Sequence, residues 1–234
     1  MALLERMTLD VIQKAFEKTK SQIQFPEGEP VLVDERNMED AIAIMRDHFF
    51  PDDPLGVATD QTLTPDMRNI CLAIFQSKIS FLVLDRTSRE PIAARFMRVN
   101  RRVETMTADM FTDPSLKMLV GLIDIIEEKA NIFERFQVDE AIQFFGMCVR
   151  RDKRRRGIGT KLVEFSIQFV KNLGIRPICI RGEPTSKFSI RIYEKSGLRH
   201  VVTMDYAGYQ KDGRPVMKTV PGEDVCCVYA AKYE

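Results

Sequence analysis

The chain has 234 residues, a formal net charge of +1 and a hydrophobic fraction of 44%. This length fits one large domain or two small ones with an ample core, and the balanced charge gives no sign of a nucleic-acid partner. Any anion site must therefore arise from local clustering of basic residues, which favours a small anionic ligand.

The cysteines and histidines do not have the spacing of a metal site. The chain has five cysteines and two histidines. We expect no metal, and we expect Cys148 and Cys179, which lie in apolar runs, to act as small core residues. The N-terminus has no signal-peptide pattern, and no apolar run is long enough to cross a bilayer. We therefore predict a cytoplasmic, reducing setting and no membrane partner.

The first elements in chain order are an amphipathic helix and a polar link. The helix is predicted over residues 7–20, and the proline-bearing link over 21–30. A short strand at 31–34 and a helix over 38–48, capped by Asn37, follow. We accordingly separate an N-terminal helix and link, residues 1–30, from a main domain over 31–234.

Residues 48–60 form the next segment, HFFPDDPLGVATD. Its two prolines and Gly56 predict an irregular segment with no regular element. Large apolar groups stand beside two adjacent acids: Phe49, Phe50, Asp52, Asp53 and Leu55. This composition is typical of a pocket wall, although an ordinary loop with an Asp-Pro turn fits it as well.

The remaining elements alternate between helices and strands. A helix over 65–78, a hairpin of strands over 79–85 and 91–99, and a helix over 114–130 come first. After an apolar run at 141–149 and its helix, we predict a strand at 176–181, a helix over 187–196, and strands near 198–209 and 225–233. A turn-rich stretch at 211–224 separates the last two. This order indicates a mixed sheet with helices on both faces.

The stretch from 141 to 173 carries the most specific chemistry. The apolar run 141–149 has the length of a buried strand, and six of the next seven residues are basic. Gly157 and Gly159 follow, and then a helix with a wide apolar face. The backbone amides of residues 155–160 would point outward together at the positive end of the helix dipole, which suits a diphosphate.

Three kinds of glycine loop compete for this stretch. A dinucleotide fold requires a third glycine where Leu162 stands, and a nucleoside-triphosphate loop requires a Gly-Lys-Ser/Thr ending, which is absent. The pattern that remains, Arg-x-x-Gly-x-Gly from Arg154 to Gly159, resembles the acetyl-CoA loop of the GCN5-related N-acetyltransferases (GNATs). A solvated basic turn or a nuclear-localisation run would leave the glycines unexplained.

Two further stretches support this resemblance. Residues 193–198, Tyr-Glu-Lys-Ser-Gly-Leu, are similar to the Tyr-Glu-Lys-x-Gly-Phe segment of the superfamily, with Leu198 in place of Phe. Residues 49–55 are similar to the Phe-Phe-x-Asp-Glu-Pro-Leu stretch of arthropod arylalkylamine N-acetyltransferases, with Asp53 in place of Glu. The resemblance implies an α/β GNAT fold: a mixed, mostly antiparallel sheet of about seven strands with helices on both faces, splayed at strands four and five.

The resemblance also implies roles for individual residues, with acetyl-CoA as cosubstrate. The backbone of Met147, Cys148 and Val149 would pair with pantetheine. The diphosphate would be held by Arg154, Arg155, Arg156, Gly157, Ile158, Gly159 and Thr160. Asp53 would act as a general base through water, Tyr193 would protonate the leaving thiolate, and Ser186 and Ser189 would lie near the coenzyme. Phe49, Phe50, Asp52 and Leu55 would contact the acceptor.

Some of these residues have simpler interpretations. A core tyrosine fits Tyr193, helix capping fits Ser186, and a solvated face fits Ser189. Asp is one methylene shorter than the Glu of the family, so Asp52 is an alternative base. We expect His48 to have a core or loop role.

The acceptor implied by the resemblance is a small arylalkylamine such as dopamine, tyramine, octopamine or serotonin. Agmatine or a polyamine, a longer acyl donor, a protein amine, and a CoA-binding module without catalysis remain alternatives. We expect a monomer or a weak dimer.

Overall fold

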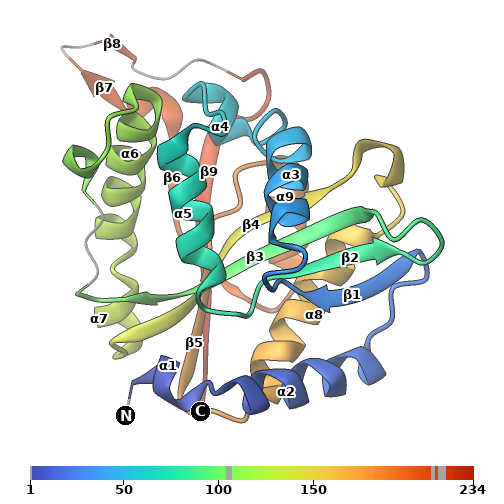
Figure 1. Ribbon diagram of the computed structural model, residues 1–234. Helices are drawn as coiled ribbons and strands as arrows, with labels where there is room; N and C mark the ends of the chain where they lie inside the picture. The colour runs from blue at the N-terminus through green and yellow to red at the C-terminus, as the bar shows by residue number, and fades with distance from the viewer. Residues whose placement is uncertain (1, 104–106, 212–213, 216–219) are drawn as a thin grey trace.

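A seven-stranded sheet forms the centre of the protein, with strands in the order β1-β2-β3-β4-β5-β9-β6 (Figure 1). The computed structural model describes residues 2–103, 107–211, 214–215 and 220–234. The strands of the sheet are β1 (Gly28–Leu32), β2 (Phe81–Asp85), β3 (Pro91–Arg101), β4 (Glu140–Val149), β5 (Ile178–Gly182), β6 (Arg199–Asp205) and β9 (Val225–Tyr233). Every neighbouring pair is antiparallel except β4 and β5, which are parallel. The predicted mixed, mostly antiparallel sheet is thus confirmed.

Helices cover both faces of the sheet, as the sequence predicts. They are α1 (Leu3–Arg6), α2 (Leu9–Gln22), α3 (Met38–His48), α4 (Pro54–Ala58), α5 (Pro65–Phe75), α6 (Pro114–Ala130), α7 (Ile132–Phe136), α8 (Ile158–Asn172) and α9 (Lys187–Lys195). A separate small sheet pairs β7 (Gln210–Lys211) with β8 (Arg214–Pro215).

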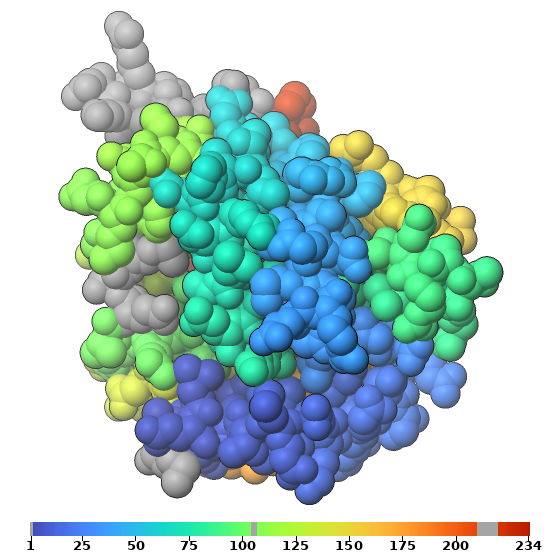
Figure 2. All heavy atoms as spheres, viewed as in Figure 1, coloured from blue at the N-terminus to red at the C-terminus, as the bar shows by residue number. Residues whose placement is uncertain are grey.

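The two faces have separate hydrophobic cores. On one face α2 and α8 pack on the strands. The ring of Phe16 there contacts the rings of Phe165 and Phe169 edge to face, with 5.3 and 5.2 Å between ring centres. On the other face α3 and α5 lie side by side and cover the middle of the sheet in the view of Figure 2. There the ring of Phe75 in α5 packs against the ring of Phe96 in β3, with 5.9 Å between the ring centres. The apolar stripes of these helices therefore fix the sheet between two layers.

The segment after α3 departs from the prediction. We expected no regular element over residues 48–60, but α4 forms within it. Pro54 stands at the first helical position, where its missing N–H costs nothing, and the Asp53 side chain accepts a hydrogen bond from the amide of Gly56 at 2.8 Å. The proline thus starts a helix here, and the expectation that it would break one was wrong.

The strand predicted near 198–209 also ends early. β6 stops at Asp205, whose side chain accepts a hydrogen bond from the amide of Ala207 and turns the chain into a short 3-10 helix at Tyr206–Gly208. The turn-rich stretch predicted at 211–224 lies partly outside the described residues.

The sheet separates between β4 and β5. These strands pair only at Ile142–Ile180, Gln143–Arg181 and Phe144–Gly182. Directly beyond the last pair, the β3–β4 ladder shifts register, because Phe96 faces Gly146 while Met97 faces Phe144. Phe145 is the extra residue of this bulge, which bends β4 away from β5. The predicted splay is therefore present, and we refer to it as the fork.

Candidate active site

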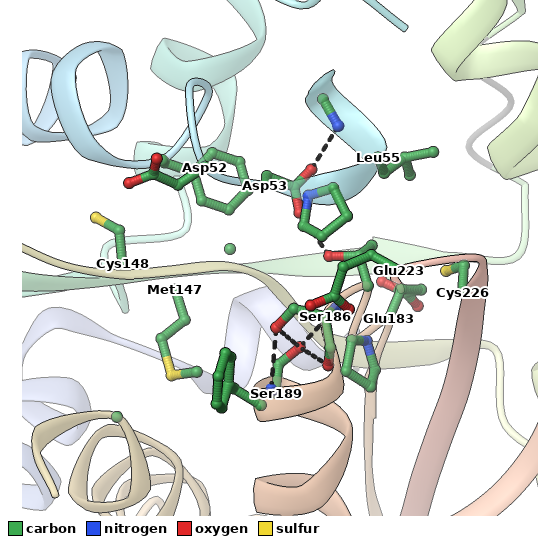
Figure 3. A pocket seen from close by; sticks show the side chains of 18 of the residues that line it. Asp52, Asp53, Leu55, Met147, Cys148, Glu183, Ser186, Ser189, Glu223 and Cys226 are labelled. Carbon is green, nitrogen blue, oxygen red and sulfur yellow. Dashed lines mark hydrogen bonds between the residues drawn. The ribbon is translucent and has the colours of Figure 1, made fainter. Parts of the chain in front are cut away.

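The fork opens into a cavity of about 960 Å³. Its wall comes from the segment between α3 and α4, the second half of β4, the start of α8, the start of α9 and one face of α6 (Figure 3). Every residue that the sequence proposed for the site lines this cavity except Arg156. Arg156 lies outside, and its guanidinium donates to the carbonyl of Asp152 at 3.3 Å.

Backbone amides gather at one end of the cavity. Gly157 has φ +81° and caps α8, while Arg155 has φ +63°. No residue described in the structure accepts a hydrogen bond from the amides of residues 155–160. Unpaired amides at a helix N-terminus form a binding site for an anion such as a diphosphate.

Gly159 lets the loop approach the adjoining elements closely. A Cβ at this position would lie 3.3 Å from Cδ1 of Ile192 in α9 and 3.9 Å from Cε of Met147 in β4. The second glycine of the motif therefore keeps the space between α8, α9 and β4 open.

Arg154 is tied to the protein instead of extending toward a ligand. Its guanidinium donates to the carbonyl of Val149 at 2.9 Å and to the carboxylate of Asp52 at 2.5 Å. Arg151 also pairs with Asp52, at 2.8 Å. Burial would raise the pKa of Asp52, but the hydrogen bonds from Arg151 and Arg154 outweigh it and hold the pKa below its usual value. Asp52 thus anchors the loop between β4 and α8 as a charged carboxylate.

The free edge of β4 faces the cavity. The amide of Arg150 donates to the carbonyl of Ile92, and Val149 stands opposite Ala93. Because backbone groups alternate along an antiparallel pair, Cys148 bonds toward β3, whereas Met147 and Val149 direct their N–H and C=O groups toward the fork. The Cys148 side chain is buried against α3, and burial raises its pKa to about 12. Of the three residues proposed here, Met147 offers its N–H and C=O to a ligand and Val149 offers its N–H, because the Val149 carbonyl already accepts a hydrogen bond from Arg154.

Asp53 lies in the cavity wall, where Figure 3 shows its carboxylate with two hydrogen bonds as dashed lines. Thr185 donates to Oδ1 of Asp53 at 2.5 Å, and Gly56 donates to Oδ2 at 2.8 Å. Burial raises the pKa of Asp53, while these two hydrogen bonds work against the rise. A carboxylate with a raised pKa is suited to accept a proton near neutral pH.

Tyr193 of α9 occupies the vertex of the fork. Its side chain is 2% exposed, and its hydroxyl accepts a hydrogen bond from Arg95 of β3 at 2.8 Å. The ring lies directly on Gly182, where a Cβ would come within 2.6 Å of the hydroxyl oxygen. Burial raises the pKa of Tyr193, and Arg95 opposes the rise. The phenol therefore stays protonated at neutral pH.

The two serines form the N-terminal cap of α9. Ser186 Oγ accepts a hydrogen bond from the amide of Ser189, and Ser189 Oγ accepts one from the amide of Ser186, both at 3.1 Å. The two hydroxyls lie 2.9 Å apart in the cavity wall (Figure 3). Both residues thus reach the cavity while also capping the helix.

The far end of the cavity is mostly apolar. Its wall includes Phe50, Leu55, Met67, Leu119, Leu122, Ile123 and Ile126. Gln61 interrupts this wall: it is 5% exposed, and neither polar atom of its side-chain amide has a hydrogen-bond partner among the described residues. Its backbone amide donates to the carbonyl of Gly56, so it sits just beyond α4, the helix that Asp53 caps.

Two further carboxylates reach the cavity, and both have partners. Glu183 accepts hydrogen bonds from Arg181 at 2.6 and 2.8 Å and from Gln143 at 3.0 Å. Glu223 accepts a hydrogen bond from the amide of Lys187 at 2.6 Å and lies 3.9 Å from its ammonium group. Asp53 is the cavity-lining carboxylate, among the described residues, that has no cationic partner.

Sequence reasoning missed four residues of this site: Arg95, Gly182, Thr185 and Gln61. An arginine inside the apolar run AARFM is an available signal for Arg95, since a lone charge within a buried strand needs a reason. For the other three, the local sequence offers no comparable signal.

Comparison with known proteins agrees with this fold. Residues 119–198 match the model of the acetyltransferase (GNAT) family. This match covers β4, α8, β5 and α9, the elements around the fork. Among solved structures, arylalkylamine N-acetyltransferase 2 from Aedes aegypti superposes with a TM-score of 0.80 at 18% identity, over 88% of this chain and 99% of that chain.

Two other structures share this GNAT fold. Mosquito arylalkylamine N-acetyltransferase like 5b superposes with a TM-score of 0.77 at 16% identity, over 88% of this chain and 100% of that one. The polyamine N-acetyltransferase of Drosophila melanogaster, which catalyses the formation of N-acetylagmatine, superposes with a TM-score of 0.75 at 18% identity, over 88% of this chain and 100% of that one. At these identities the likeness establishes the fold.

Among the described residues, no helix combines the length and apolar character needed to cross a membrane.

Proposed function

We propose that the protein transfers an acetyl group from acetyl-CoA directly to the primary amine of a small arylalkylamine. The observation that carries this proposal is the joining, in one cavity, of the unpaired amides at the start of α8 with the half-buried, cation-free carboxylate of Asp53. The first suits the diphosphate of a coenzyme, and the second suits the removal of a proton from an amine.

The donor half of the proposal rests on backbone groups. The amides of residues 155–160 would hold the diphosphate, and the free edge of β4 at Met147 and Val149 would bind pantetheine as an added strand. The amide of Met147 would then polarise the thioester carbonyl and stabilise the oxyanion that forms in the transition state. The fork, which leaves this edge unpaired, is the feature that favours a linear thioester carrier.

The acceptor half rests on Asp53. An alkylammonium ion has a pKa of about 10, so most of the substrate arrives protonated and cannot attack. Asp53 would take this proton, directly or through a water molecule, and the free amine would attack the thioester carbon. As the C–S bond breaks, Tyr193 would donate its proton to the departing sulfur.

The apolar far end of the cavity favours an aromatic acceptor over a polyamine. A long cation with two charged ends needs a second free carboxylate, but Glu183 and Glu223 are each paired with a basic residue. An aryl ring instead fits against Leu55 and the apolar residues of α6.

A panel of amines tests the proposal. The purified protein is mixed with acetyl-CoA and either tyramine, dopamine, serotonin, phenethylamine, agmatine or spermidine, and the release of free thiol is followed. We expect turnover with the arylalkylamines and at least tenfold lower kcat/KM with agmatine and spermidine. Parallel reactions with longer acyl-CoA donors test the acyl chain length.

Two other results would contradict the proposal. A preference for agmatine would make the protein a polyamine acetyltransferase that uses Glu223 despite its contact with Lys187. Calorimetric binding of CoA without turnover on any amine would make it a binding module.

A further inference from the structure

Arg95 is a buried cation without a carboxylate partner. It lies in the middle of β3 and is 1% exposed, with its guanidinium stacked 4.3 Å from the centre of the Phe144 ring. One nitrogen donates to the hydroxyl of Tyr193 at 2.8 Å, and another lies 3.5 Å from the carbonyl of Gly146. Nε has no partner, and no described carboxylate lies within ion-pair distance. Arg95 is also among the residues that line the cavity.

Arg181 provides the contrast on β5, which β4 separates from β3 in the sheet. It is also 1% exposed, but its guanidinium lies 2.6 Å from Glu183 and 3.0 Å from Glu127, and it bonds to Asn100 as well. A buried charge is expensive unless a partner of opposite charge compensates for it. Arg181 meets this condition in the folded chain, whereas Arg95 does not. The position of Arg95 therefore indicates that an anion forms beside it during function.

The location of that anion follows from the geometry of the fork. The last β4–β5 pair is Phe144–Gly182; the ring of Phe144 lies under Arg95, and Gly182 lies against the hydroxyl of Tyr193. Arg95 and Tyr193 thus meet where the strands separate and the cavity begins. The group that Arg95 contacts, the Tyr193 hydroxyl, becomes an anion when it loses its proton.

We propose that Arg95 is a positioning residue that holds the Tyr193 hydroxyl and supplies the counter-charge for the phenolate left when this hydroxyl protonates the departing CoA sulfur. This inference rests on the proposed acetyl transfer. In that step the amine nitrogen forms a bond to the acyl carbon, and the electron pair of the C–S bond leaves on sulfur. The nitrogen, positively charged after the attack, releases its second proton to water as the amide forms. Sulfur takes the proton of Tyr193, and the phenolate later recovers a proton from solvent.

The charged surroundings of Tyr193 agree with this role. Burial raises the pKa of the phenol, Arg95 from β3 lowers it, and Glu183, which follows β5, raises it slightly. From β9 the ring of Tyr229 lies 5.8 Å away. Arg95 is thus the group around Tyr193 that favours its ionised form.

Four variants test the inference: Arg95→Met, which keeps the length but removes the charge; Arg95→Lys, which keeps the charge; Tyr193→Phe; and the double variant Arg95→Met with Tyr193→Phe. Steady-state kinetics are measured with acetyl-CoA and the best amine of the panel. We expect Arg95→Met to lower kcat on the order of tenfold or more, to leave KM for acetyl-CoA within about twofold, and Arg95→Lys to restore part of kcat. In the Tyr193→Phe background, Arg95→Met should lower kcat by less than about twofold, because the effects of substitutions at two residues that act as a unit are not additive.

Thermal unfolding without ligand gives a second, independent readout. Loss of an unpaired buried charge should leave the midpoint of Arg95→Met equal to or above that of the wild type, whereas Arg181→Met should lower it clearly by stranding Glu183 and Glu127. A structural arginine would behave in the opposite way at position 95.

Several results would overturn the inference. Unchanged kcat in Arg95→Met, or an equal loss of kcat in the wild-type and Tyr193→Phe backgrounds, would each do so. If Arg95→Met does not fold, Arg95→Gln replaces it in the test, because glutamine keeps the hydrogen bond but not the charge. The kcat of Arg95→Gln must then fall by the amount expected for Arg95→Met. A wild-type protein without turnover on any amine would instead refute the proposed function, and the unfolding comparison would still report on the unpaired charge.

Discussion

Thr185 Oγ1 lies 2.5 Å from Oδ1 of Asp53, and this hydrogen bond joins the segment after β5 to the start of α4. It spans the mouth of the fork and fixes the carboxylate relative to the strand that carries Gly182. The same bond also sets the protonation of Asp53, because it favours the charged form against burial.

Asp53→Asn should lower kcat/KM with an arylalkylamine on the order of a hundredfold or more at neutral pH, since the amide cannot accept the proton. The wild-type rate should fall at acidic pH as Asp53 takes up its proton, at a pH above the usual range of an aspartate, and the variant should lack this limb. A full rate in the variant across the pH profile would remove Asp53 from the mechanism.

The same variant has an opposite effect on stability. The folded-state pKa of Asp53 lies above its unfolded value, so its contribution to stability is fully present below the unfolded pKa and is lost as pH rises through the folded one. Because Asn can still cap α4, Asp53→Asn should unfold at a temperature equal to or higher than wild type near neutral pH. This advantage should disappear below about pH 4, and thermal unfolding at the two pH values measures it.

Thr185→Val should move the acidic limb of kcat to higher pH. The substitution keeps the shape of the side chain but removes the hydrogen bond that stabilises the Asp53 carboxylate, so the pKa rises further, by about one unit for about 1.4 kcal/mol lost from the charged form. Thr59→Val is the matched control, because Thr59 is buried nearby and donates to the carbonyl of Leu55 instead. An equal shift in both variants would mean that the effect is not specific to Asp53.

Gly157→Ala should weaken CoA binding through backbone strain. Gly157 has φ +81°, and a Cβ there would meet nothing within 4 Å, so the cost is conformational, about 1–2 kcal/mol. Gly174, at the other end of α8, has φ +69° and equally open surroundings, which makes Gly174→Ala the control. Both variants should lose similar stability, but only Gly157→Ala should raise the Kd for CoA several-fold by calorimetry. Similar Kd values for both would argue against the amides of this loop as the diphosphate site.

Gln61→Leu tests whether the unpartnered amide recognises a polar group on the acceptor ring. An amide that both donates and accepts is suited to a phenolic hydroxyl in an otherwise apolar wall. The variant should lower kcat/KM for tyramine by about tenfold and leave phenethylamine within about twofold, because removal of a buried hydrogen-bonding group affects only the substrate that uses it. Equal losses on both amines would assign Gln61 to the structure of the cavity.

The features predicted correctly from the sequence are those that residues close together in the chain determine. The turn at Gly157 and Gly159 is local, because two glycines between an apolar strand and an amphipathic helix permit few alternatives. The helices α3, α6 and α8 follow their apolar spacing in the same way. For Pro54, by contrast, the rule that proline breaks regular structure was misapplied, since Asp53 beside it is a good N-cap.

The residues that the sequence did not predict depend on contacts between distant segments. Thr185 is significant only because the fork brings it to Asp53, and Gly182 only because the ring of Tyr193 lies on it. Asp52 and Asp53 are neighbours in sequence, yet Asp52 pairs with Arg151 and Arg154 while Asp53 faces no cation. Which of the two adjacent acids has no cationic partner is decided by the loops after β4 and β5, which lie far away along the chain.

Only three residue pairs between β4 and β5 join the two parts of the sheet through backbone pairing. Four strands lie on one side of the fork and three on the other, and along this line the backbone ladder ends at Phe144–Gly182. A molecule bound along Met147 and Val149 would continue the sheet across the opening, as a missing strand would. Occupancy by CoA should therefore slow amide hydrogen exchange in β5, β9 and β6 as well as in the loop that grips the diphosphate, so that the substrate serves for a time as part of the scaffold.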